Sequence, residues 1–267
     1  MEIQKVFSNI EDPEENLYSV LMTEEELTLY SESKDHTTRN GALIVGGGLV
    51  GNTILGKKVM DNFDRHISEE EGKVANKLVE NGKKKGLNVV EHGAGIPGPA
   101  YGKGVVYRNH TKDAGSLAHE LGHAYYDREK KAGKIGKVAH KAYLKTGGSI
   151  GGATIPGLAG IASGIYSGKA KAKREKEGKK EGKISKHSGW AVPVALSAPM
   201  LVSEAAASRK GIKLLKQSGA SKKVIKDAKK NLSGAFGTYA TQVAANAGVG
   251  QIAKGMAYKR EKKKSQN

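Results

Sequence analysis

The chain has 267 residues, 37% of them hydrophobic, which is long enough to bury the core of one large domain or two small ones. It contains no cysteine, which excludes disulfides, thiolate metal ligands and a cysteine nucleophile, and leaves His, Asp and Glu as candidate metal ligands. The net charge of +18 divides into −8 for residues 1–35 and +26 for the remainder, a balance that suits nucleic acid, anionic lipid or an acidic partner.

Residues 1–40 are predicted to form an acidic arm. Thr23 and Glu26 make a capping-box pattern ahead of apolar residues in 27–30, which predicts a short amphipathic helix. The acidic start, with no long apolar run after it, differs from a secretory signal. We interpret the arm as a separate docking segment.

Residues 41–86 form the second predicted region. A short uncharged stretch, Gly41–Gly56, is followed by a charged one, Lys57–Lys85. Val74, Leu78 and Val79 stand at helical spacing in the charged part, which predicts a surface helix there.

Between residues 87 and 110 the sequence turns to Gly, Pro and β-branched residues. The stretches NVV and GVVY, which ends at Tyr107, predict short strands joined by loops. Asp113 or Ser116 can cap the helix that follows, which carries LAHELGHAYYDREKK and should end before Gly133.

That helix contains the HExxH pattern. His119 and His123 are four residues apart, so their imidazoles project from one helix face and can share a metal ion. Glu120 can accept the proton of a water on that metal, so that hydroxide attacks a polarised peptide carbonyl. A chance HExxH on a surface helix is the alternative.

A catalytic zinc site needs a third protein ligand, and Glu204 is the best downstream candidate. It is the only carboxylate in the helical stretch APMLVSEAAASRKGIKLL, where an unpaired acid would be costly. A salt bridge to Arg209 or Lys210 is the alternative for this residue. An out-and-back helical hairpin at 146–203 would return the chain to the side it left and place Glu204 beside His119.

Three further stretches lack charge: 146–168, 187–203 and 231–253. Each approaches the roughly 20 residues that cross a bilayer, but they are rich in Gly, Ala, Ser and Thr. They predict either a transmembrane hairpin or a soluble or virion-packed one, with small residues four apart allowing close helix packing. The basic stretch 169–186 suits anionic headgroups or is an ordinary solvated charge run, and 254–267 is read as a basic tail.

Three blocks in this order resemble the neutral zinc metallopeptidases of the YugP type, a family of bacterial membrane proteins with a gluzincin-like HExxH and a downstream Glu. They are LAHELGHA, PMLVSEAAASRKGIKLLKQSG and AKKNLSGAFGTYATQVAA, and the likeness covers roughly residues 87–253. The family has no counterpart to the residues before about 85, and its apolar segments are less rich in glycine.

The resemblance implies a Zn²⁺ ion held by His119, His123 and Glu204, with Glu120 as general base. Ser208 falls where related gluzincins place an Asp that orients an imidazole, a task that serine performs more weakly. Tyr239 could donate a hydrogen bond to the tetrahedral oxyanion, or be an interfacial or core tyrosine. His110 is a competing donor or a loop residue.

The sequence therefore predicts a mainly α fold with a small β-sheet, and a zincin-like domain at 87–253 that contains the hairpin at 146–203. The first functional hypothesis is a membrane-associated zinc endopeptidase that acts on polypeptide. The second is a phage virion or membrane-interaction protein that keeps a zincin fold but binds lipid, DNA or virion proteins. The second draws on the acidic arm, which is similar to short segments of phage-encoded structural proteins, and on the basic remainder of the chain.

Overall fold

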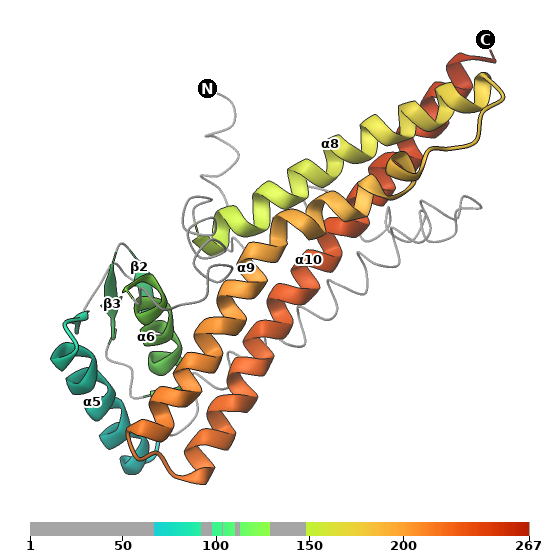
Figure 1. Ribbon diagram of the computed structural model, residues 1–267. Helices are drawn as coiled ribbons and strands as arrows, with labels where there is room; N and C mark the ends of the chain where they lie inside the picture. Colours follow the sequence, from blue (N-terminus) through green and yellow to red (C-terminus); the bar gives the residue numbers. More distant parts are fainter. Residues whose placement is uncertain (1–66, 92–97, 103, 110–112, 129–147, 267) are drawn as a thin grey trace, which may run out of the picture.

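The computed structural model describes residues 67–91, 98–102, 104–109, 113–128 and 148–266. In this part the chain has five helices and one three-stranded sheet, which confirms the predicted mainly α fold with a small sheet (Figure 1). The predicted helix of the acidic arm, the uncharged stretch Gly41–Gly56 and His110 lie outside the described residues.

The first helix, α5 (Glu69–Lys84), confirms the predicted surface helix. The Oγ of Ser68 caps it by accepting from the backbone N–H of Glu71, at 3.2 Å. Three glutamates in the first turn and two lysines in the last turn suit the helix dipole. The apolar face with Val74 and Leu78 is buried in the same core as the helix that carries HExxH, so α5 belongs to that structural unit.

The sheet consists of β1 (Asn88–Val90), β2 (Ala100–Gly102) and β3 (Val105–Tyr107) in the order β1-β3-β2. The two strands expected from NVV and GVVY are β1 and β3, and they pair in parallel. β2 pairs with β3 in the antiparallel sense and lies next to the following helix.

That helix is α6 (Ala114–Arg128). Of the two expected caps, Asp113 starts it: its carboxylate accepts from the backbone N–H of Gly115 at 2.9 Å and also bonds Ser116. Leu117 and Leu121 are fully buried between α5, the sheet and the end of α9. We call α5, the sheet and α6 the head of the molecule.

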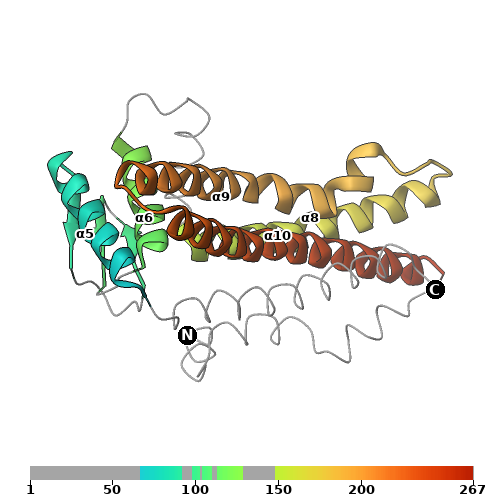
Figure 2. The same ribbon diagram turned by 90° about the horizontal axis from the view of Figure 1, so that it is seen from below.

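Three long helices make up the rest: α8 (Gly148–Lys176), α9 (Lys183–Gln217) and α10 (Lys222–Lys264). They run alternately up and down as a bundle that extends far beyond the head (Figures 1 and 2). Helices α8 and α9 form the expected hairpin. The basic residues from 254 onward, expected as a tail, continue α10 to Lys264.

Glycines let the three helices approach closely. A Cβ at Gly164 would clash with the carbonyl oxygen of Gly250, and one at Gly189 would lie 3.0 Å from that same oxygen. One turn nearer the head, a Cβ at Gly160 would lie 3.1 Å from the Cγ of Pro193. The small residues thus fix the register of α8, α9 and α10.

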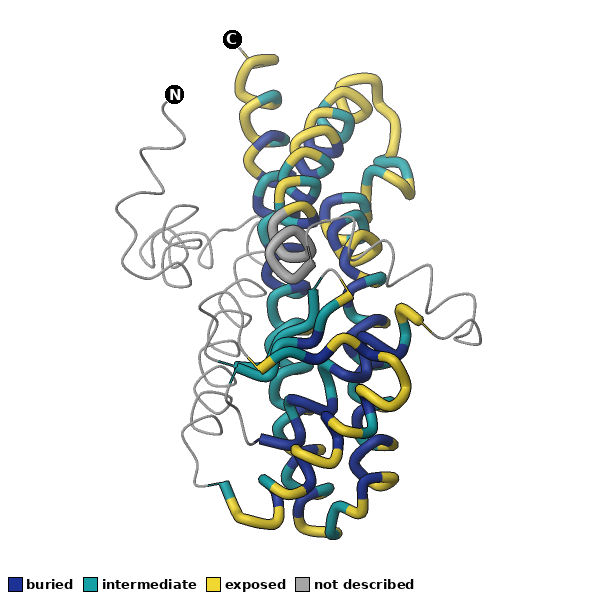
Figure 3. The backbone as a smooth tube through the Cα atoms, turned by 90° about the vertical axis from the view of Figure 1, so that its left-hand side faces the viewer, coloured by how far each residue is buried: buried dark blue, intermediate teal, exposed yellow. Residues whose placement is uncertain are grey.

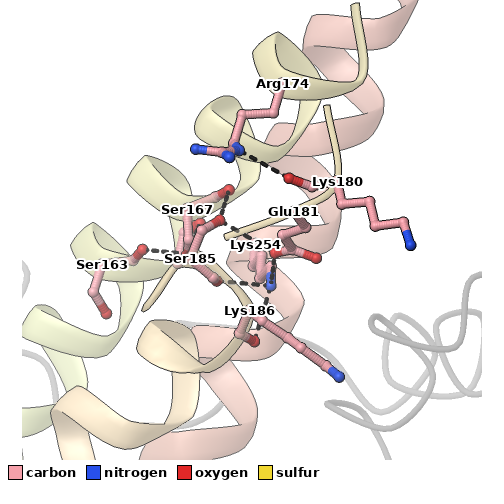
Figure 4. Close-up of polar contacts among 9 residues, drawn as sticks. Ser163, Ser167, Arg174, Lys180, Glu181, Ser185, Lys186 and Lys254 are labelled. Atoms are coloured by element: carbon pink, nitrogen blue, oxygen red, sulfur yellow. Dashed lines mark hydrogen bonds and ion pairs between the residues drawn. The ribbon is translucent and has the colours of Figure 1, made fainter. Parts of the chain in front are cut away.

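The far end of the bundle is tied by a buried lysine (Figure 4). The Nζ of Lys254 on α10 lies 2.6 Å from Glu181 Oε1 and donates to the carbonyl oxygens of Ser185 and Lys186 at 2.9 and 3.0 Å. All three donors of the ammonium group are therefore used. Around this cluster exposed residues become frequent, whereas buried residues are common near the head (Figure 3).

Candidate metal centre

Helix α6 presents His119 and His123 one turn apart, as their spacing predicts. Their ring centroids are 4.8 Å apart and the rings are nearly perpendicular. The side chain of His123 is 7% exposed and that of His119 13% exposed. Two imidazoles thus share a largely dry site on one helix face.

Glu204 on α9 completes the group. Its Oε2 lies 3.0 Å from Nε2 of His119 and its Oε1 lies 3.5 Å from Nε2 of His123. The carboxylate, 3% exposed, faces both imidazoles, so the alternative of an ordinary pair with Arg209 or Lys210 does not describe this site. The ligand atoms of the three residues all lie within 4.8 Å of one another, so the group could hold a metal ion.

Two glycines allow α6 and α9 to come this close. A Cβ at Gly122 would clash with the carbonyl oxygen of Ala207, and one at Gly211 would lie 2.8 Å from the carbonyl oxygen of Ala118. Gly122 is the third residue of the HExxH pattern's interior, and Gly211 follows Glu204 by two turns. The close approach of these backbones is what brings the distant carboxylate to the imidazoles.

Ser208, one turn after Glu204, contacts the other nitrogen of His119. Its Oγ lies 3.1 Å from Nδ1. If the hydroxyl accepts from Nδ1–H, Nε2 is left with its lone pair toward Glu204 and the point where a metal would sit. This is the position where the family resemblance implies an orienting residue.

Glu120 lies next to the group and is partly buried. Burial raises its pKa above the ordinary value, although His119, His123 and a backbone hydrogen bond from Tyr101 act in the opposite direction. A carboxylate with a raised pKa is better suited to accept and return a proton near neutral pH.

The pKa of His119 is also raised. Burial alone would lower it, but the hydrogen bond to Glu204 and the charges of Glu120 and Glu204 outweigh that effect. A dication would take the place of this proton, because only a neutral imidazole binds metal.

Tyr101 is a site residue that sequence reasoning did not identify. Its backbone bonds Glu120, its ring stacks with that of His123 at a centroid distance of 6.3 Å, and its hydroxyl donates to Asp127 Oδ2 at 2.5 Å. Burial and Asp127 raise the pKa of this tyrosine above its ordinary value. The sequence around it offers little signal, because Tyr101 stands in the short segment AYG between Pro99 and Lys103.

The predicted oxyanion donor, Tyr239, lies on α10 and is partly buried. Its role as an oxyanion donor stays a prediction.

Two neutral imidazoles and one carboxylate form a ligand set found in catalytic zinc sites, which leave a further position for water or substrate. His119, His123 and Glu204 therefore fit zinc. Comparison with protein-family models, curated proteins and solved structures finds no match for this chain. The resemblance to YugP-type metallopeptidases accordingly rests on the sequence blocks alone.

Proposed function

We propose that the protein is a zinc-dependent endopeptidase, in which His119, His123 and Glu204 hold the metal and Glu120 is the general base. The observation that supports this most is the meeting of Glu204 with the two imidazoles of HExxH, 85 residues away along the chain from His119. A chance HExxH on a surface helix would not be expected to acquire a buried carboxylate partner.

Zinc in such a site supplies a Lewis acid that polarises a peptide carbonyl and makes water easier to deprotonate. Glu120 would accept the proton from the attacking water and pass it to the leaving amine. The backbone hydrogen bond from Tyr101 holds the Glu120 carboxylate in place for both transfers. Ser208 would orient His119 without touching the substrate.

Membrane association is part of this proposal. By length and composition α9 could cross a membrane, a property that core helices of soluble proteins can share. Only 33% of the 18 most apolar consecutive residues of α9 are buried, a smaller share than in a helix at the centre of a soluble core. Among the described helices α9 alone meets this criterion, and membrane association is proposed on that helix.

A second candidate function is supported by the charge at the ends of the bundle. Exposed basic residues lie at both ends, among them Lys173, Arg174, Lys229, Lys230 and Lys262. A virion or membrane-interaction protein could use them to bind anionic lipid or DNA without relying on proteolysis. Salt-sensitive binding to anionic vesicles or DNA, in a chain that takes up no stoichiometric zinc, would favour this function.

The decisive experiment combines metal analysis with a change of the general base. The purified chain should bind about one zinc per molecule and degrade an unstructured protein such as casein. Glu120→Gln should keep the zinc but lose activity by on the order of 10²–10⁴-fold, because it cannot accept a proton. His119→Ala should lose both zinc and activity.

Glu80→Gln is the matched control, since Glu80 is exposed on α5 and the change is the same. It should leave zinc content and activity unchanged. Full proteolysis by the Glu120→Gln variant, or a wild-type chain that takes up no zinc, would remove the proposed function.

A further inference from the structure

The metal centre lies at one edge of an uncharged band of the bundle. On α9 the uncharged residues 187–203 end directly before Glu204. On α8 they are 148–168, and on α10 they are 231–253. The contacts of Gly164 and Gly189 with Gly250 show that the three stretches lie side by side at the same height.

The band has the thickness of a bilayer core. At 1.5 Å per residue, the uncharged stretches of α9, α8 and α10 are about 25, 31 and 34 Å long, against roughly 30 Å for the hydrocarbon. The described residues of these stretches are all α-helical, the backbone form that can span lipid, although Pro156, Pro193 and Pro199 each lack the N–H of a regular helical hydrogen bond.

Large apolar side chains point outward halfway along the band. Leu158, at the middle of the α8 stretch, is 62% exposed, and Leu196, near the middle of the α9 stretch, is 48% exposed. Other exposed apolar residues of the band are Ile155, Ile165, Val194 and Val202. Exposing such a surface to water costs free energy, whereas contact with lipid chains does not.

The far edge of the band has the features of a membrane–water boundary. Tyr166 is 75% exposed and Trp190 41% exposed, and both stand within four residues of a lysine. Such aromatic side chains are enriched at the level of the lipid headgroups. Beyond them comes the basic segment 169–186, and Lys254 at this edge is paired with Glu181 (Figure 4).

The near edge is charged as well. Arg209 and Lys213 on α9, with Lys229 and Lys230 on α10, are exposed just beyond it. Glu204 stands between the last uncharged residue of α9 and these bases, with its charge facing the imidazoles.

We propose that lipid covers this band and that the metal centre therefore lies at the surface of a bilayer, with the head in water. The protein would then cleave polypeptide segments within a few residues of the membrane surface, such as those flanking a membrane anchor. The position in the bilayer stands on the band alone, whereas the choice of substrate rests on the proposed peptidase function.

Measurements of the depth of single residues in the bilayer test the position of the band. Because the sequence has no cysteine, each introduced cysteine is the only site of labelling. Leu196→Cys, Val202→Cys and Lys213→Cys each receive a fluorophore, in the Glu120→Gln background, after reconstitution into vesicles of neutral and anionic phospholipid. Quenchers on the lipid chains should remove most emission at position 196, less at 202 and little at 213, and aqueous iodide should give the reverse order. Trp190, the sole tryptophan, reports on the unlabelled chain and should be quenched best by groups near the headgroups.

Equal quenching of all three positions by iodide would mean that lipid does not cover the band, and would overturn the proposal. Failure of the chain to remain with the vesicles would do the same. Because neither readout needs metal or activity, these results are independent of the proposed function.

The substrate class is tested with a polypeptide on a single transmembrane anchor, whose cleavable segment begins about 5 or about 30 residues from the bilayer. The zinc-loaded wild-type chain should cut the near segment faster in the same vesicles. Equal rates would overturn the interfacial substrate while leaving the peptidase function intact. Cleavage of neither segment, nor of casein, would instead remove the peptidase function and leave the depth result standing.

Discussion

At the scale of a single residue, Ser208 contacts one imidazole of the candidate metal centre. Its Oγ lies 3.1 Å from Nδ1 of His119, so it helps to decide which ring nitrogen faces Glu204. We expect Ser208→Ala to weaken zinc binding by about 10–100-fold, the usual effect of losing an orienting partner. Competition with a zinc-chelating dye measures the zinc affinity of each variant.

Ser208→Thr, which keeps the hydroxyl, should retain most of the zinc affinity, and Ser233→Ala at an exposed site of α10 should leave it unchanged. Unchanged affinity in Ser208→Ala would contradict the orienting role.

At the scale of helices, the contact between α6 and α9 assembles the centre. Gly122→Ala would place a methyl group against the carbonyl oxygen of Ala207, so the two helices must separate. We expect a loss of about 1–3 kcal/mol in the free energy of unfolding, together with weaker zinc binding. Denaturant unfolding followed by circular dichroism, with a zinc titration, checks both.

Gly102 offers the comparison for that variant, because a Cβ there would have nothing within 4 Å. Gly102→Ala should leave both measurements close to wild type. If Gly122→Ala proved equally harmless, the close approach of α6 and α9 would not be what holds the ligands together.

The tie at the far end of the bundle gives a second prediction at this scale. Lys254→Met removes the partner of Glu181 and the donor to two carbonyl oxygens. Because Glu181 is partly solvated, with its side chain 20% exposed, we expect a loss of about 2 kcal/mol, below that for a fully buried pair. Adding Glu181→Gln to Lys254→Met should restore part of the lost free energy of unfolding in the same measurement. A double variant less stable than Lys254→Met would show that the pair is not the source of the effect.

Sequence reasoning was strongest where the structure is local. The four-residue spacing of His119 and His123 determines their shared helix face, and Asp113 marks the start of that helix. Glu204 could be selected because an acid in an apolar helical stretch needs a partner, but its distance from the imidazoles depends on backbone contacts at Gly122 and Gly211. Such contacts leave no periodic pattern in a sequence.

Other features could not be predicted for physical reasons. β2 has only three residues, too few for an alternating pattern, so Tyr101 and its bond to Glu120 stayed hidden. Helix α9 continues through Pro193 and Pro199, although proline usually interrupts a helix. The uncharged stretch 187–203 and the stretch that carries Glu204 are therefore parts of the single helix α9.

On the scale of the whole molecule, charge and apolar surface are segregated along the bundle. Basic residues gather at its two ends, while the band between them carries outward apolar side chains such as Leu158 and Leu196. The net charge of +18 alone does not distinguish lipid from DNA as a partner. Its placement on either side of an uncharged band is the feature that favours a bilayer.

The candidate metal ligands come from two helices that are far apart in the sequence, with His119 and Glu204 85 residues from each other. A cation bound to both residues would cross-link the two ends of this long segment and reduce the conformational entropy of the unfolded chain. Loading with metal would thus stabilise the junction of head and bundle as well as equip the site for chemistry. The apo chain would open first where α6 meets α9.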